Sequence, residues 1–168
     1  MTIHSEHPFL DPDPDQARRL RGRLGGQVSL WTAGSGAERA GLPVSSMLVV
    51  PGVPPMVIGL LDPDSDLGQL LRGSEAARCV VQLLEWRHRD LAEQFAGQMP
   101  APGGAFAQAQ WVQTGSGPRL ADASTWAEVV VGDVRDVGWS VEVTAAIAGL
   151  VVGDDDEPLL HRRGRYHH

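Results

Sequence analysis

The apolar residues of this chain gather in short runs that are separated by glycine, proline and acidic residues. Runs of this length are typical of β-strands, and they occur at 28–32, 44–50, 56–61, 77–84, 106–112, 126–131, 139–145 and 147–152. Helical spacing of apolar residues predicts three helices, at 16–24, 64–71 and 87–95. Because strands and helices do not alternate regularly, the pattern predicts a mainly β protein whose antiparallel sheet is closed or sandwiched.

The N-terminal part of the chain divides into a tail and a first helix. Residues 1–14 contain a repeated Asp-Pro pair and little that could be buried, so we expect a flexible tail followed by one domain at 15–168. Asp15 is a suitable N-cap for the first helix, which is rich in arginine and ends at two glycines. Its apolar positions, including Leu20 and Leu24, have the spacing of one helix face.

The charged residues narrow the range of partners. The chain has 21 acidic and 14 basic residues, a net charge of −7 and an isoelectric point near 5.2, which argues against nucleic-acid binding and against a polybasic membrane surface. Every basic residue is arginine, so a Walker-type phosphate loop and a pyridoxal Schiff base are excluded. The single cysteine, the acidic N-terminal segment and the lack of an apolar run of about 20 residues predict a cytoplasmic protein without a membrane span.

The chain has no motif for covalent or metal-dependent catalysis. Cys79 lies in an apolar run and is interpreted as a packed, unreactive thiol. The six histidines lack metal-ligand spacing, so no metal site is expected, and the acidic run at 154–157 is typical of a solvated turn. The glycine-rich stretches at 34–39 and 115–120 lack the third glycine of a dinucleotide loop and are interpreted as hairpin turns.

One segment, residues 41–47, places hydroxyl groups and backbone amides at the entry to a strand. Such donors can bind an anion or the polar edge of an aromatic ring, because they need hydrogen-bond partners. On composition alone, a structural turn is the favoured interpretation of this segment.

Five segments together resemble the flavin reductase-like family, whose members bind FMN on a split β-barrel. The segments are GQVSLWTA at 26–33, AGLPVSSM at 40–47, PPMVIGLLD at 54–62, LAEQFAG at 91–97 and PLLHRRGRY at 158–166. Their order and spacing over about residues 16–168 make the resemblance specific. It implies a six-stranded antiparallel Greek-key split barrel with few helices, and a homodimer with FMN near the subunit interface.

The resemblance also implies the positions of the binding residues. The segment Pro43–Ser46 would lie along the isoalloxazine ring and the ribityl chain, and residues 62–67 would hold the phosphate. The flavin-binding residues expected in this way are Pro43, Val44, Ser45, Ser46, Leu61, Asp62 and Ser65. The residues expected where flavin and nicotinamide meet are Trp139, Gly164, Arg165 and Tyr166.

The implied function is that of an FMN-binding oxidoreductase of the NAD(P)H:flavin reductase type, with FAD as the other candidate flavin. It would pass a hydride from NADH or NADPH to the flavin and supply reduced flavin to a monooxygenase partner. No catalytic residue is expected, because the flavin itself performs the hydride chemistry. The family often has an Asp-Arg-Ser-Ser-Arg-Thr-like run where this chain has DPDSDL at 62–67, so that carboxylates and leucine replace basic and hydroxyl groups. This departure motivates the alternative of a split-barrel homodimer with a degenerate phosphate site, either non-catalytic or using haem or a deazaflavin.

Overall fold

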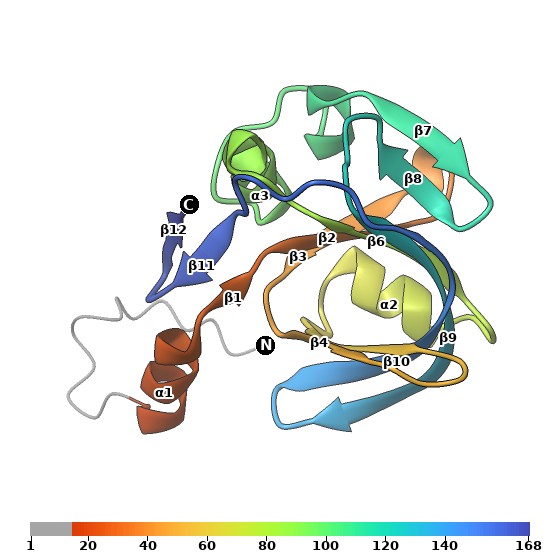
Figure 1. Ribbon diagram of the computed structural model, residues 1–168, viewed down its shortest axis with the longest axis horizontal. Helices are drawn as coiled ribbons and strands as arrows, with labels where there is room; N and C mark the ends of the chain where they lie inside the picture. Colours follow the sequence, from red (N-terminus) through yellow and green to blue (C-terminus); the bar gives the residue numbers. More distant parts are fainter. Residues whose placement is uncertain (1–14) are drawn as a thin grey trace.

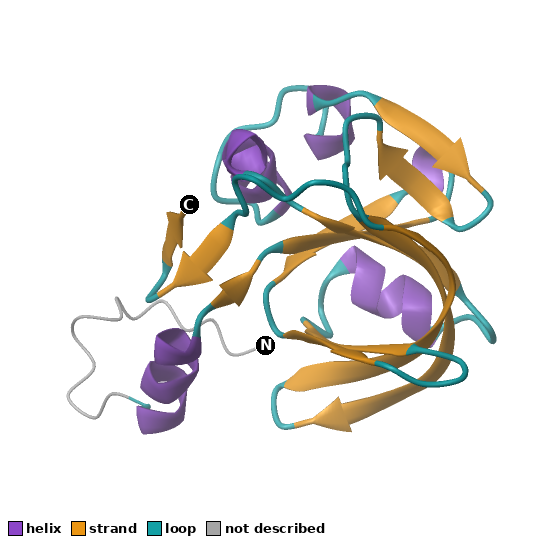
Figure 2. Ribbon diagram, viewed as in Figure 1, coloured by secondary structure: helices purple, strands orange, loops and turns teal. Residues whose placement is uncertain are grey.

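The computed structural model describes residues 15–168, so the predicted flexible tail at 1–14 lies outside the described residues (Figure 1). Strands dominate the described chain, as the hydrophobic pattern predicts (Figure 2). In chain order, the elements are α1 (Gln16–Leu24), β1 (Gly26–Gln27), β2 (Ser29–Ala33), η1 (Gly36–Glu38), β3 (Ala40–Val44), β4 (Met47–Val50), β5 (Met56–Leu61), α2 (Asp66–Arg72), β6 (Arg78–Leu83), η2 (Trp86–His88), α3 (Arg89–Phe95), η3 (Ala105–Gln108), β7 (Trp111–Thr114), β8 (Gly117–Leu120), β9 (Trp126–Val137), β10 (Ser140–Val151), β11 (Leu160–Arg162) and β12 (Arg165–His167).

Seven strands form one curved antiparallel sheet in the order β3-β2-β6-β9-β10-β5-β4. Its two edge strands, β3 and β4, are separated in sequence only by Ser45 and Ser46, so the chain crosses from one edge to the other at these serines. With β3 and β4 counted as one segment, six segments form an incompletely closed barrel, which confirms the predicted mainly β split barrel. The small sheets β1-β11-β12 and β7-β8 pair outside it.

The main core lies between the curved sheet and α2, which Figure 1 shows within the curve. Trp31 of β2 is fully buried there, and its indole N–H donates to the Ser29 hydroxyl at 3.0 Å. Gly59 of β5 faces this ring, because a Cβ at that position would lie 2.7 Å from it. The α2 side chains Leu67 and Leu71 complete the core, as the spacing at 64–71 predicts.

A second core joins α3 and the β7–β8 hairpin to the outside of the barrel. Gln82 of β6 is fully buried at this junction. Its side-chain oxygen accepts from the Leu120 backbone N–H at 2.7 Å, and its amide nitrogen donates to the Thr32 hydroxyl at 3.1 Å. The Thr32 hydroxyl in turn donates to the Pro118 carbonyl at 2.5 Å, so buried polar groups attach the hairpin to the barrel.

Two of the predicted strand boundaries are wrong for reasons of sheet geometry. The predicted strand 44–50 is broken at Ser45 and Ser46, because β3 pairs with β2 whereas β4 pairs with β5. The predicted strands 139–145 and 147–152 are one strand, β10, whose pairing with β9 shifts register after Thr144 and again after Ile147. Such shifts let a long strand bend around a barrel without ending.

Two further predictions fail because of tertiary packing. The predicted strand 106–112 is the short helix η3 followed by β7, because Phe106 packs edge-on against Phe95 and its carbonyl accepts from the Trp111 indole N–H at 2.8 Å. Helix α1 forms at 16–24 as predicted, but its face does not enter a core. Leu20 and Leu24 are 64% and 77% exposed, and no residue of the helix is buried.

Candidate functional site

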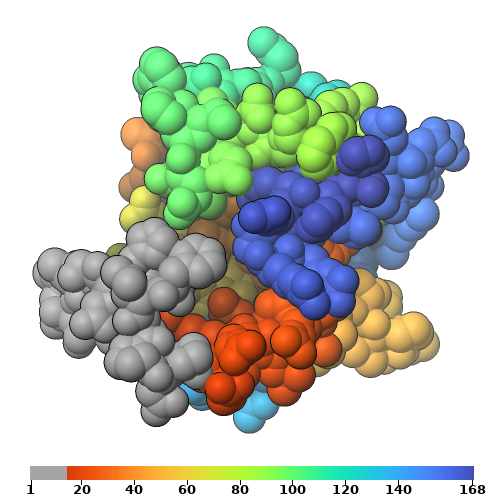
Figure 3. Space-filling model, turned by 90° about the vertical axis from the view of Figure 1, so that its left-hand side faces the viewer, coloured from red at the N-terminus to blue at the C-terminus, as the bar shows by residue number. Residues whose placement is uncertain are grey.

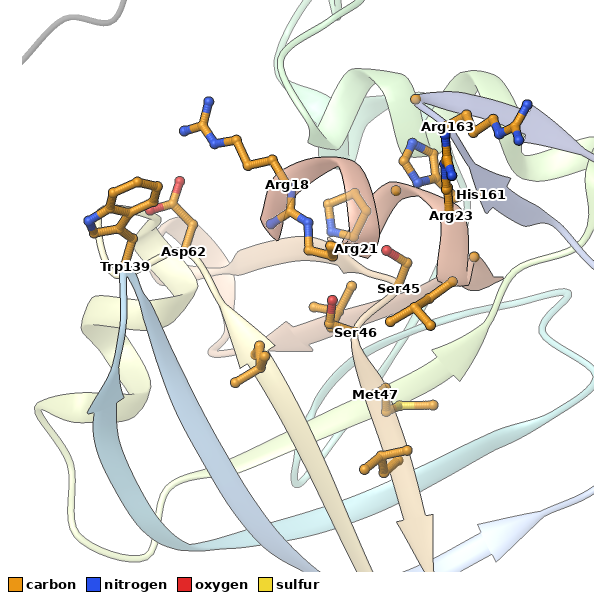
Figure 4. A pocket seen from close by; sticks show the side chains of 18 of the residues that line it. Arg18, Arg21, Arg23, Ser45, Ser46, Met47, Asp62, Trp139, His161 and Arg163 are labelled. Carbon is orange, nitrogen blue, oxygen red and sulfur yellow. The ribbon is translucent and has the colours of Figure 1, made fainter. Parts of the chain in front are cut away.

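A cavity of about 1490 Å³ opens between α1 and one end of the barrel. Figure 4 shows Ser45 and Ser46 near its centre, Trp139 and Asp62 at one end, and His161 and Arg163 at the other. These residues come from parts of the chain that are more than 100 positions apart.

The middle of the cavity is formed where β3 passes into β4. The Ser46 carbonyl accepts from the Leu60 N–H at 3.0 Å, which holds the crossing segment against β5. Gly26 lies against the same segment, because a Cβ there would be 2.7 Å from the Ser45 carbonyl oxygen. The hydroxyls of Ser45 and Ser46 make no hydrogen bond to another residue of the described chain, so both remain able to bind a ligand.

Helix α1 covers one side of the cavity. Asp15 caps it by accepting from the Ala17 N–H at 3.0 Å. Its C-terminal turn is attached to the turn between β11 and β12, because the Gly22 carbonyl accepts from the Arg163 N–H at 2.8 Å and the Arg23 carbonyl accepts from the Arg162 side chain at 3.2 Å. Figure 3 accordingly shows α1 (red) and the C-terminal hairpin (blue) as neighbours on this face.

Trp139 lies at the tip of the β9–β10 turn and is 76% exposed. The Arg18 guanidinium lies 5.4 Å from the centre of its ring, so a cation–π contact connects α1 to this hairpin across the cavity edge. Nearby, Glu142 binds Arg135 through two hydrogen bonds of 2.8 and 3.1 Å, which lower the pKa of this carboxyl.

His161 lines the opposite end of the cavity, and its ring packs edge-on against Tyr166 at 5.5 Å. Burial lowers the pKa of His161 below its usual value near 6.5, and the charge of Arg21 lowers it further; Glu93 opposes this with a smaller effect, and His167 contributes the smallest lowering. The imidazole is therefore neutral at pH 7. Burial raises the pKa of Tyr166, as does the charge of Glu93.

The chain matches the family model of the flavin reductase like domain over residues 21–168. It belongs to the flavin reductase-like family. This match confirms the resemblance that the sequence segments indicate, and it covers nearly all of the described residues. The comparison with curated proteins finds no match.

Solved structures share the fold of this flavin reductase-like domain at low sequence identity. The NADH:FAD oxidoreductase SgcE6 of Streptomyces globisporus, in complex with NAD and FAD fragments, is 22% identical, with a TM-score of 0.79 over 91% of this chain and 90% of that chain. The flavin reductase PheA2 is 21% identical, with a TM-score of 0.80 over 92% and 97%. The styrene monooxygenase flavin reductase of Pseudomonas putida S12 is 19% identical, with a TM-score of 0.77 over 91% and 96%.

Most of the predicted binding residues of this flavin reductase-like domain meet at one cavity. Those that line it are Pro43, Val44, Ser45, Ser46, Asp62, Trp139 and Gly164. Four others do not line it. Leu61 is a core residue that is 1% exposed, and Ser65 is the N-cap of α2. Arg165 is exposed on β12, and Tyr166 packs against the second core.

Among the cavity residues that the sequence analysis did not identify are the arginines of α1, the turn residue Arg163 and His161. The signal was present as the run of arginines in 18–23 within an otherwise acidic chain. The sequence pattern predicts a basic helix but not its position, because α1 is held beside the cavity by its hydrogen bonds to the C-terminal hairpin.

Residues 15–168 offer little sign of a metal site, a membrane helix or a reactive side chain. No cluster of three metal-ligating side chains occurs among them, and none of their helices has the length and apolarity needed to cross a membrane. Cys79 is fully buried, and burial raises the pKa of its thiol to about 12, which confirms an unreactive cysteine. In a second cavity, of about 590 Å³, His88 hydrogen-bonds Asp122 at 3.2 Å and accepts from the Glu85 N–H at 3.0 Å, so its ring is held in place by the fold.

Proposed function

We propose that this protein is an NAD(P)H:flavin oxidoreductase that uses FMN, with FAD as the alternative flavin. The observation that carries the proposal is that Pro43, Val44, Ser45 and Ser46 line one cavity that has Trp139 at one end and Gly164, next to Arg163, at the other. These are positions that family membership associates with the flavin ring and with the junction between flavin and nicotinamide.

The groups around the cavity fit a flavin. Ser45 and Ser46 supply hydroxyls that are not used by residues 15–168, and Met47 and Ile58 supply apolar surface for an aromatic ring. The volume of about 1490 Å³ exceeds the roughly 1000 Å³ upper range of ordinary small-molecule pockets. A flavin and a nicotinamide therefore have room to lie in contact.

When bound, a flavin supplies the hydride-accepting centre, so the protein needs no acid–base pair of its own. The residues that line the cavity would bind the flavin and orient it toward the nicotinamide. The β3–β4 crossing presents Ser45 and Ser46 to the polar edge of the ligand, and α1 shields the cavity from solvent on one side. His161, neutral at pH 7, adds no charge at the end of the cavity that carries Arg163.

We propose a homodimer with the flavin near its interface. The support is an apolar surface on the β4–β5 hairpin, where Leu48, Val49 and Val53 are 66%, 59% and 104% exposed. Leu48 also lines the cavity, so a subunit seated on this hairpin would border the ligand. Light scattering at low protein concentration tests this, since a monomer that still binds flavin contradicts an interface-bound cofactor.

A monooxygenase is the proposed acceptor of the reduced flavin, and the cytoplasm the proposed location. The support for the acceptor is the likeness to a protein named as the flavin reductase of styrene monooxygenase. The acidic composition and the single cysteine support the location.

The test is a visible absorption spectrum of the purified protein during titration with FMN and FAD, followed by anaerobic addition of NADH and then of NADPH. We expect perturbed flavin bands that bleach with a nicotinamide, which also identifies the donor. Bands that remain unperturbed at saturating flavin would reject the reductase in favour of a non-catalytic split-barrel protein or one that uses haem or a deazaflavin.

A further inference from the structure

An uncompensated positive charge lies on one wall of the cavity. Four arginines of α1 line it, and within residues 15–168 only Arg18 has an acidic partner, Asp15 at 3.7 Å. Arg21, Arg23 and Arg163 form no salt bridge with any acidic side chain of residues 15–168. Arg19, which also lines the cavity, has no salt bridge within residues 15–168 either, so four cavity arginines are without an acidic partner in the described part of a chain whose net charge is −7.

The acidic residues of the cavity do not neutralise these arginines. Asp15 caps α1 and pairs with Arg18, and Glu142 binds Arg135. Asp62 accepts from the Asp64 backbone N–H at 2.9 Å and lies with Trp139 at the end away from Arg163 (Figure 4). Asp62 thus lies at one end of the cavity, whereas Arg23 and Arg163 lie at the other and Arg21 lies between them (Figure 4).

The segment expected to hold the phosphate is poorly suited to an anion. Asp62, Asp64 and Asp66 are all exposed carboxylates that would repel it. The one retained hydroxyl, that of Ser65, already donates to the Asp62 carbonyl at 2.6 Å and accepts from the Gly68 N–H at 3.0 Å. A phosphate placed there meets like charge and no free hydroxyl.

We propose that Arg21, Arg23 and Arg163 form the subsite for the phosphate group of the flavin, in place of the segment after β5. The inference rests on the proposed function, because it takes the cavity to be the flavin site. Guanidinium groups suit this task, since their planar donors match phosphate oxygens in pairs. Cations from the first helix and the last hairpin then hold the phosphate beside Gly164, so the junction of flavin and nicotinamide falls at the Trp139 end of the cavity and does not include Gly164.

The position of α1 agrees with a binding role. No side chain of the helix is buried, so its arginines are not needed to pack a core. The helix is instead attached to the β11–β12 turn through backbone carbonyls of Gly22 and Arg23. This attachment brings the side chain of Arg23 to the same end of the cavity as Arg163, whereas Arg21 lies nearer the middle, above the serines (Figure 4).

The test compares FMN with riboflavin, which has the same ring and ribityl chain but no phosphate. Binding is measured by flavin fluorescence for the wild type, the double variant Arg21→Gln/Arg23→Gln and the single variant Arg163→Gln. The matched control, Arg78→Gln, removes one exposed arginine of β6 outside the cavity. Arg21→Lys/Arg23→Lys keeps the charge and checks that α1 remains in place.

We expect the double variant to raise the Kd for FMN at least about tenfold, as for lost charge-assisted hydrogen bonds, and to leave the Kd for riboflavin unchanged. Arg163→Gln should act in the same direction, the lysine variant should retain most of the FMN affinity, and the control should match the wild type. An FMN-to-riboflavin affinity ratio that stays at the wild-type value in the double variant overturns this inference alone. Failure of the wild type to bind either flavin overturns the proposed function, and this inference with it.

Discussion

Two serines that the sequence assigns to the same flavin site differ in their structural surroundings, and a pair of substitutions separates them. Ser65 is the N-cap of α2, where its hydroxyl accepts from the Gly68 N–H at 3.0 Å and donates to the Asp62 carbonyl at 2.6 Å. Ser46 lines the cavity, and its hydroxyl makes no hydrogen bond to the rest of residues 15–168. We therefore expect Ser65→Ala to reduce stability and Ser46→Ala to reduce flavin affinity.

The loss of stability can be worked from the contacts of Ser65. Replacing an N-cap serine by alanine costs about 1 kcal/mol, and up to about 2 kcal/mol in unfavourable cases. The upper part of this range applies, because α2 carries the buried core residues Leu67 and Leu71 and the hydroxyl loses both of its hydrogen bonds. For a protein of this size, about 1–2 kcal/mol corresponds to a decrease in Tm of roughly 3–6 °C.

The expected loss of affinity at Ser46 comes from one hydrogen bond. A net contribution of about 0.5–1.5 kcal/mol corresponds to an increase in the Kd for FMN of roughly two- to tenfold, with Tm close to that of the wild type. Thermal unfolding and FMN titration are measured for both variants, so that each serves as the control for the other. The reasoning is refuted if Ser65→Ala weakens FMN binding more than Ser46→Ala does while its Tm stays unchanged, because the segment after β5 would then hold the ligand.

Two further predictions concern the core and the protonation of the cavity. Gln82→Leu removes the hydrogen bonds to the Leu120 N–H and the Thr32 hydroxyl and leaves a buried donor unpaired. The free energy of unfolding, measured with urea, should therefore decrease by about 2–4 kcal/mol. A decrease below about 1 kcal/mol would contradict a stabilising role of this buried network. NMR titration should place the pKa of His161 below 6.5, and Arg21→Gln should raise it. With a lowered pKa, the folded state binds fewer protons than the unfolded state near pH 6.5. The contribution of His161 to stability therefore falls as the pH decreases from about 7 through 6.5 towards its folded pKa. A measured pKa at or above 6.5 would contradict the lowered pKa of this histidine.

The sequence by itself determined the local elements and the class of the fold. Asp15 followed by helical residues and terminal glycines predicts α1 at its observed bounds, and the leucines at 67 and 71 predict the buried face of α2. These features depend on residues within one or two turns of each other, which is the range over which capping and periodicity act. The resemblance to the flavin reductase-like family, carried by five short segments, is likewise a property of the chain alone.

The tertiary structure decided where the strands break and what the basic helix contacts. Ser45 and Ser46 interrupt an apolar run because β3 and β4 have different neighbouring strands, a fact that no local pattern records. The arginines of α1 reach the cavity because Gly22 accepts a hydrogen bond from Arg163, about 140 positions later in the chain. Contacts over such separations form only when the whole sheet has closed, so the cation-lined end of the cavity is a product of folding, although each arginine is visible in the sequence.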